Sequence, residues 1–60
     1  MIVNENILRR AEQAVELAKS FIASHFPEYD AVEMAMEQFG LWCEEQADEL
    51  FDLICKMVFS

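Results

Sequence analysis

The residues best suited to chemistry are acidic, and they are concentrated in one stretch. The segment WCEEQADELFDLIC, from Trp42 to Cys55, holds five acids in nine positions and no base among them. On a helix, acids four positions apart face one another, and each such pair costs about 0.2–0.5 kcal/mol. A run of this kind indicates either a solvated face that keeps the protein soluble or an anionic surface that docks a basic partner.

Two acid pairs in this stretch, Glu45-x-x-Asp48 and Glu49-x-x-Asp52, have a spacing at which carboxylates on one helix face can share a divalent cation. They resemble half of the E-x-x-E and E-x-x-D pattern of the all-α nucleotide pyrophosphatases. The resemblance implies, as one alternative function, a metal-dependent nucleotide pyrophosphatase-like helical fragment. Phosphate groups also require basic residues, and this half of the chain offers only Lys56. We therefore expect no metal and no cofactor.

Few other residues could support catalysis. The single histidine, His25, has no second histidine or orienting partner in view, so a capping or core role is expected in place of a Cys–His nucleophile. Cys43 and Cys55 are twelve residues apart, which is roughly 18 Å along one helix. A disulfide needs Cα atoms within about 7 Å. We predict free thiols, with Cys43 in the core and Cys55 partly exposed, and no enzymatic activity.

The net charge of −8 is unevenly placed, because residues 27–60 hold nine acids and one base whereas residues 1–26 hold three of each. Nucleic acids and anionic membranes need a basic footprint, so direct binding to either is not expected. A basic protein, which could itself bind nucleic acid, is the expected partner. The acidic run places about one charge per 2.7 Å of helix axis, and duplex DNA carries one per about 1.7 Å. Because these charge densities are comparable, a DNA-mimic inhibitor is a second alternative.

The location is expected to be cytoplasmic. The first residues, MIVNENILRR, do not combine a basic segment with the long apolar run of a signal peptide. No apolar stretch approaches the ~20 residues that a membrane span requires.

A first helix is predicted over residues 4–25. Asn4 is a good N-cap, and the apolar residues that follow recur in steps of three and four, as in a packed helix pair. Pro27 disfavours helix geometry in the residue before it, which predicts a turn over 26–29. Asp30 and Glu33 then form a capping box for a second helix.

The second helix is predicted to run over residues 30–58. Its apolar rhythm passes unbroken through Gly40, which costs only about 1 kcal/mol inside a helix. An alternative with three helices and a break near Gly40 remains open. The core-facing positions on the long helix are Val32, Met36, Phe39, Cys43, Gln46, Leu50, Leu53, Ile54 and Met57.

These elements predict an all-α fold in which the whole chain, residues 1–60, is a single helical domain built as a hairpin of two antiparallel helices. The second arm is about 43 Å long and the first about 32 Å, so the segment DLICKMVFS overhangs and needs cover. A second copy would supply it through a two-fold interface, which predicts a homodimeric helical bundle. The predicted core and dimer residues are Leu8, Ala11, Val15, Ala18, Ile22, Phe39, Leu50, Leu53, Ile54 and Met57.

Met34 and Leu41 are predicted to lie among the acids, away from the core, whereas Trp42 flanks the core-facing stripe and is predicted to be a packing residue. Apolar residues set among charges indicate a binding surface or a second bundle seam. The predicted partner-binding residues are Glu37, Glu44, Glu45, Asp48, Asp52, Met34 and Leu41.

The whole chain resembles, in size, acidity and helical pattern, the small acidic helical proteins encoded in the early regions of temperate lambdoid phages. The resemblance implies a non-enzymatic effector in the host cytoplasm that binds a host or phage protein and modulates phage development. A bacterial adaptor of the same shape would have the same sequence features. We therefore predict a protein–protein interaction module that acts as a small regulator.

Overall fold

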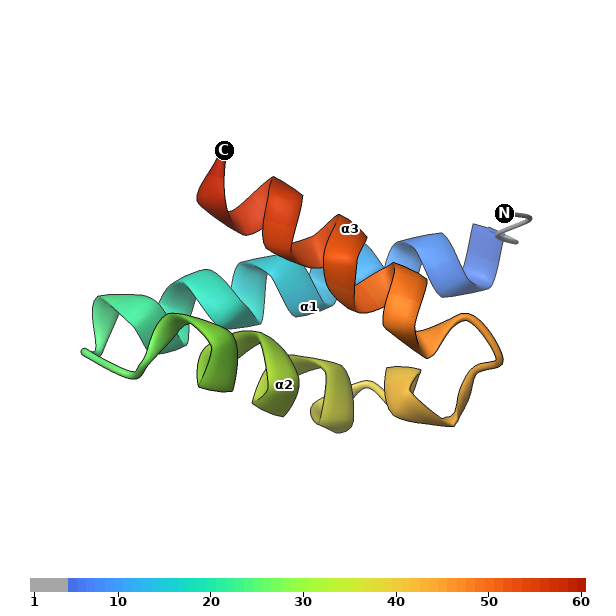
Figure 1. Ribbon diagram of the computed structural model, residues 1–60, viewed down its shortest axis with the longest axis horizontal. Helices are drawn as coiled ribbons and strands as arrows, with labels where there is room; N and C mark the ends of the chain where they lie inside the picture. Colours follow the sequence, from blue (N-terminus) through green and yellow to red (C-terminus); the bar gives the residue numbers. More distant parts are fainter. Residues whose placement is uncertain (1–4) are drawn as a thin grey trace.

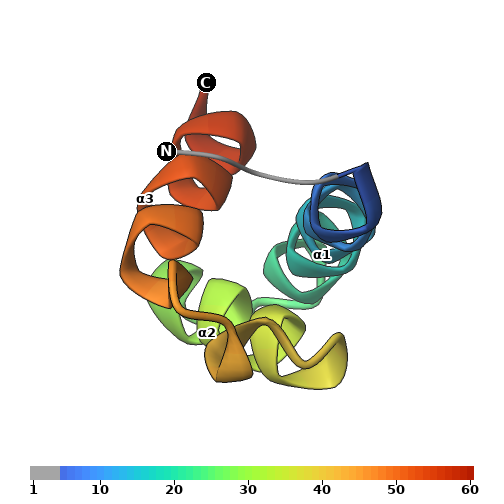
Figure 2. The same cartoon turned by 90° about the vertical axis from the view of Figure 1, so that its right-hand side faces the viewer.

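In the computed structural model, residues 5–60 are described, and they form three α-helices and one short 3-10 turn. The helices are α1 (Glu5–Ala23), α2 (Glu28–Gln38) and α3 (Ala47–Phe59), and the turn η1 (Leu41–Cys43) lies between α2 and α3. α1 and α2 run antiparallel, and α3 turns back across them (Figure 1). Seen from the end, the three helices surround a common interior (Figure 2). The predicted all-α class is confirmed.

The first helix lies where the sequence predicts it, although Asn4, its predicted N-cap, is outside the described residues. Its inner face consists of small side chains, and α2 presents small residues as well. Small residues let two helix backbones approach closely. The buried residues on these two faces are Ala11, Ala14, Val15 and Ala18 on α1 and Ala31, Val32, Ala35 and Met36 on α2.

α1 ends in a backbone cap centred on His25. The N–H of His25 donates to the carbonyl of Ile22 (3.0 Å), and the N–H of Phe26 donates to that of Phe21 (3.1 Å). His25 has a positive φ of 71°, and the Phe21 and Phe26 rings are in contact, with centroids 5.1 Å apart. This pair of bonds with its apolar contact is a Schellman motif. His25 therefore caps the helix through its backbone, and its side chain is exposed.

The structure corrects the predicted single helix over residues 30–58. α2 ends at Gln38, and Gly40 adopts a left-handed conformation (φ 69°, ψ 21°), which glycine enters without steric penalty. The N–H of Gly40 donates to the carbonyl of Glu37 at 3.1 Å, which closes the end of the helix. A continuous helix would carry the apolar face of α3 away from α1. The break at Gly40 allows that face to be buried.

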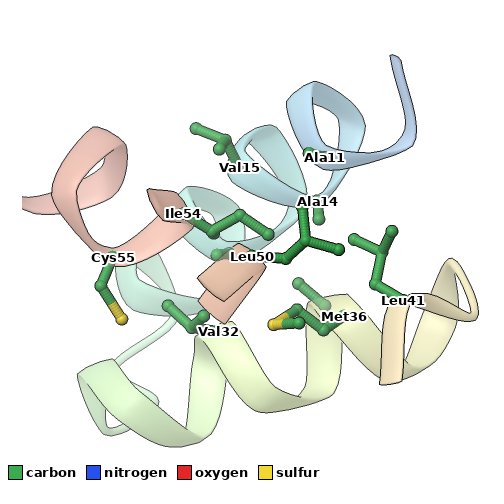
Figure 3. Packing of buried hydrophobic residues seen from close by; sticks show 11 residues of the cluster. Ala11, Ala14, Val15, Val32, Met36, Leu41, Leu50, Ile54 and Cys55 are labelled. Carbon is green, nitrogen blue, oxygen red and sulfur yellow. The ribbon is translucent and has the colours of Figure 1, made fainter. Parts of the chain in front are cut away.

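α3 packs back onto α1 and α2 and completes one core. Leu50 and Ile54 of α3 are fully buried, and Figure 3 shows them between the inner faces of α1 and α2. Burying a side chain of this size contributes about 1.5–3 kcal/mol. The C-terminal segment therefore finds its cover within its own chain. The overhang that motivated the homodimer is not present in this structure, and the dimer stays a prediction.

The other predicted core residues differ in their exposure. Ile22, Phe39 and Leu53 are half-buried. Leu8 and Met57 are 44% and 38% exposed, so they lie outside the core of the single chain, and a place for them in a dimer interface stays a prediction. Leu8 lies near the start of α1 and Met57 near the end of α3, and α3 diverges from α1 towards its C-terminus (Figure 1). Within residues 5–60, no helix combines the length and the apolar character that crossing a membrane requires.

Candidate partner-binding surface

The break at Gly40 divides the predicted acidic face into separate parts. Met34 and Glu37 lie on α2 and line one groove together. Asp48 and Asp52 lie on the outer side of α3, where they line a second hollow of about 350 Å³. Glu45 is exposed in the turn before α3. The structure therefore does not bring the seven predicted residues onto one surface.

Leu41 and Trp42 are placed opposite to the predictions for them. Leu41, expected to be exposed among the acids, is fully buried and points into the core (Figure 3). Trp42, expected to be a packing residue beside the core, is 40% exposed. A 3-10 turn has about three residues per turn, so neighbouring side chains point in very different directions. The left-handed Gly40 sets this turn so that Leu41 faces inward.

Glu44 is withdrawn from the acidic surface by an ion pair with Arg10 of α1. The Arg10 Nη2 lies 2.6 Å from Glu44 Oε2, and its Nη1 donates to the carbonyl of Phe39 at 3.0 Å. Arg10 and Glu44 are each less than a third exposed. Phe39 precedes η1 and Glu44 follows it, so these two bonds, which we call the Arg10 clamp, hold both ends of η1 to α1. Hydrogen bonds from a charged donor are among the stronger ones in proteins.

The outer face of α2 forms a groove of about 400 Å³, here called the α2 groove. Its acids, Asp30, Glu33 and Glu37, follow one another in steps of three and four, so they share one face of the helix over about 10 Å. All three are exposed. No basic side chain from residues 5–60 lines this groove. Its apolar lining consists of Phe26, Pro27, Met34 and Trp42.

The indole of Trp42 is fixed in place on this groove. Its Nε1–H donates to the backbone carbonyl of Glu33 at 3.0 Å. Its ring packs against Phe51 of α3, with centroids 5.7 Å apart and planes inclined by 31°. A large aromatic side chain that is immobilised yet still partly exposed is typical of the anchors of protein interfaces.

The same contact continues into a row of aromatic rings along the junction of α2 and α3. Tyr29 stacks near Phe51 at 6.4 Å and meets Phe59 edge-to-face at 5.7 Å. This row was not predicted from the sequence, because its rings come from three separate segments. Phe51, Cys55 and Phe59 follow one another in steps of four, and this spacing was the available signal.

The two thiols have the opposite of their predicted exposures. Cys55, predicted to be partly exposed, is buried, whereas Cys43, predicted to be buried, is exposed. Burial raises the pKa of the Cys55 thiol, and the neighbouring carboxylate of Asp52 raises it further. A raised pKa favours the unreactive thiol form. Among residues 5–60, no group of three or more His, Cys, Asp or Glu side chains is arranged to hold a metal ion.

Comparison of the chain with protein-family models, curated proteins and solved structures finds no match. The resemblance to small phage early-region proteins stays a prediction. The basis for assigning a function is therefore the chemistry of the α2 groove and of the aromatic residues that border it.

Proposed function

We propose that this protein is a non-enzymatic binding module whose α2 groove holds a basic amphipathic segment of a partner protein. The observation that supports this most directly is the composition of the groove, which combines four apolar residues with three carboxylates and, within residues 5–60, no lining base. Desolvated apolar contacts supply affinity, whereas surface charge mainly steers encounter and selects the partner. The α2 groove offers both within one surface.

The spacing of the acids favours a helical partner segment. Asp30, Glu33 and Glu37 follow the i, i+3, i+7 pattern, and a helix laid along α2 can present basic residues at the same spacing. Amphipathic helices dock into grooves through anchors that recur every three or four residues. Met34, which lies on the same face as the acids, would receive the apolar side of such a helix.

The charge balance supports a protein partner over a nucleic acid. A chain with a net charge of −8 repels phosphates, and the three groove carboxylates add to that repulsion locally. Binding to a basic segment of another protein would mask that segment. We propose that this small protein regulates its partner in this way. An imitator of DNA would depend on charge alone, and the apolar lining of the groove favours docking of a specific segment instead. This lining includes Met34 and Trp42.

A fluorescence titration tests the proposal, because Trp42 is the only tryptophan and lies in the groove. The probe is a designed peptide helix with leucines on one face and arginines along its flank. We expect saturable changes in Trp42 emission, and we expect a peptide of the same composition in scrambled order to bind at least about tenfold more weakly.

A matched pair of variants separates the groove from net charge. The groove variant carries Asp30→Asn, Glu33→Gln and Glu37→Gln, and the control carries Glu5→Gln, Glu12→Gln and Glu16→Gln on the exposed side of α1. Each loses three negative charges, one of them from the first turn of a helix. The groove variant should bind about tenfold more weakly and the control within about twofold. Equal losses in both would show that net charge alone attracts the peptide and would contradict the proposal.

A further inference from the structure

We infer that Trp42 is a stacking platform for an arginine of the partner segment, whose guanidinium lies on the exposed indole and pairs with the carboxylates of Glu33 and Glu37. This inference rests on the proposed function, because it specifies the chemistry of the partner at the same groove. It identifies the residue that would determine which basic segments are accepted.

The contacts of Trp42 leave its ring surface as the part that a partner can use. The indole N–H is already bonded to the carbonyl of Glu33, so it does not need a hydrogen-bond acceptor from the partner. Phe51 packs against the ring from the side of α3. Trp42 is 40% exposed and lines the α2 groove. An aromatic ring with no free polar group attracts a cation through its π face.

The ring is also held in position before any partner arrives. The Arg10 clamp fixes the residues on both sides of η1, and the bond to Glu33 fixes the indole to α2. A side chain that is ordered in the free protein loses little conformational entropy on binding. Little of the binding free energy of a stacking contact is therefore lost to ordering the indole.

The surrounding carboxylates favour arginine over lysine. Glu33 and Glu37 line the same groove as the indole. A guanidinium is planar and weakly hydrated, so it can stack on an indole while its N–H groups donate to carboxylates. A lysine ammonium is a strongly hydrated point charge, which can reach a carboxylate but gains less from the ring. The partner segment should therefore present an arginine at the position facing Trp42.

Isothermal titration calorimetry with two designed peptide helices tests this inference. The peptides are identical except for one flanking position, which is arginine in one and lysine in the other. The wild-type protein should bind the arginine peptide about threefold to tenfold more tightly. Trp42→Phe should retain part of this preference, and Trp42→Leu should bind both peptides equally.

Two results would overturn the arginine platform while leaving the proposed function intact. One is equal binding of both peptides to the wild type, and the other is an undiminished preference in Trp42→Leu. Failure of both peptides to bind the wild type would overturn the proposed function together with the platform. A further measurement uses only the wild type, so it does not depend on whether the variants fold. In the bound arginine peptide, the side-chain protons of that arginine should shift upfield because of the indole ring current, and an unchanged shift contradicts stacking.

Discussion

The two faces of α2 differ in how they use similar residue types. The inner face buries two alanines, Val32 and Met36, all without exposure, and it packs closely against α1 and α3. The outer face leaves Met34 only half-buried, in a groove that exposed acids also line. A methionine that the fold does not need for its core is available to a partner. Under the proposed function, α2 stabilises the protein with one face and binds the partner segment with the other.

Met36 and Met34 allow the sharpest test of this difference, because they are the same residue type on the same helix. Met36→Ala should lower the free energy of unfolding by about 2–5 kcal/mol, since it removes a fully buried side chain. Met34→Ala should lower it by less than about 1 kcal/mol but weaken peptide binding about fivefold to tenfold. Urea denaturation followed by circular dichroism gives the stabilities. Equal losses of stability would mean that Met34 belongs to the core.

The outer face depends on the Arg10 clamp, and a neighbouring arginine provides the control. Arg10→Met removes two hydrogen bonds and leaves Glu44 unpaired, so the unfolding free energy should fall by about 2 kcal/mol. The emission of Trp42 should shift to longer wavelength, because η1 is no longer held to α1.

Arg9→Met removes the same charge from an exposed position, and it should change stability by no more than about 0.5 kcal/mol. Val15→Ala, a core change that removes neither bond of the clamp, should lower stability without moving the Trp42 emission of the folded protein. An identical emission shift in Val15→Ala would mean that the Arg10 effect is general loosening, and that the clamp does not position Trp42.

The division between the inner and outer faces also depends on the break at Gly40. A broken helix and a continuous helix predict stability changes of opposite sign for Gly40→Ala. Gly40→Ala forces alanine into a left-handed conformation (φ 69°), so stability should fall by about 1–2 kcal/mol. An added Cβ would meet only Arg10 Nη1, at an ordinary 3.7 Å, so the cost lies in the backbone. Inside a continuous helix the same change would stabilise by about 1 kcal/mol. Thermal melts of Gly40→Ala and Gly40→Asn distinguish the broken helix from the continuous one. Asparagine should lower stability less than alanine, because it tolerates the left-handed conformation.

Gly40 also shows why part of the fold could not be predicted from the sequence. α1 depends on local signals and lies where it was predicted, but the second helix was predicted to begin at Asp30 and begins at Glu28. Pro27 is its N-cap, with no side-chain cap bond, so the predicted capping box of Asp30 and Glu33 was wrong. The break at Gly40 depends on a balance between a helical penalty of about 1 kcal/mol and the burial of Leu50 and Ile54 against α1. That burial is a contact between distant segments, and the apolar rhythm does not change at the break.

The candidate site could be predicted only in part for the same reason. Met34 and Glu37 lie on one helix, so their spacing indicated a shared surface, and the groove contains both. Trp42 joins them only because the chain turns at Gly40 and the Arg10 clamp holds the turn. The ring contacts with Phe51 and Tyr29 come from three separate segments. No periodicity within one helix encodes these contacts.

The smallest expected effect concerns the two thiols, which lie on opposite sides of the division between core and surface. Cys43 is exposed and Cys55 is buried, and burial with the nearby Asp52 raises the pKa of Cys55. Alkylation with iodoacetamide in native buffer should therefore modify Cys43 first, and Cys55 should react at the same rate as Cys43 only in denaturant.

The raised pKa of Cys55 also determines the direction in which folding stability changes with pH. The folded state favours the neutral thiol, so this contribution to stability is fully present below the pKa of the unfolded chain and is lost as the pH rises through the folded value. The free energies of unfolding of the wild type and Cys55→Ala, taken from denaturation curves, should therefore converge as the pH becomes alkaline. Equal alkylation rates for both cysteines in the native protein would mean that the aromatic row opens readily, and the α2–α3 junction would then belong to the mobile surface.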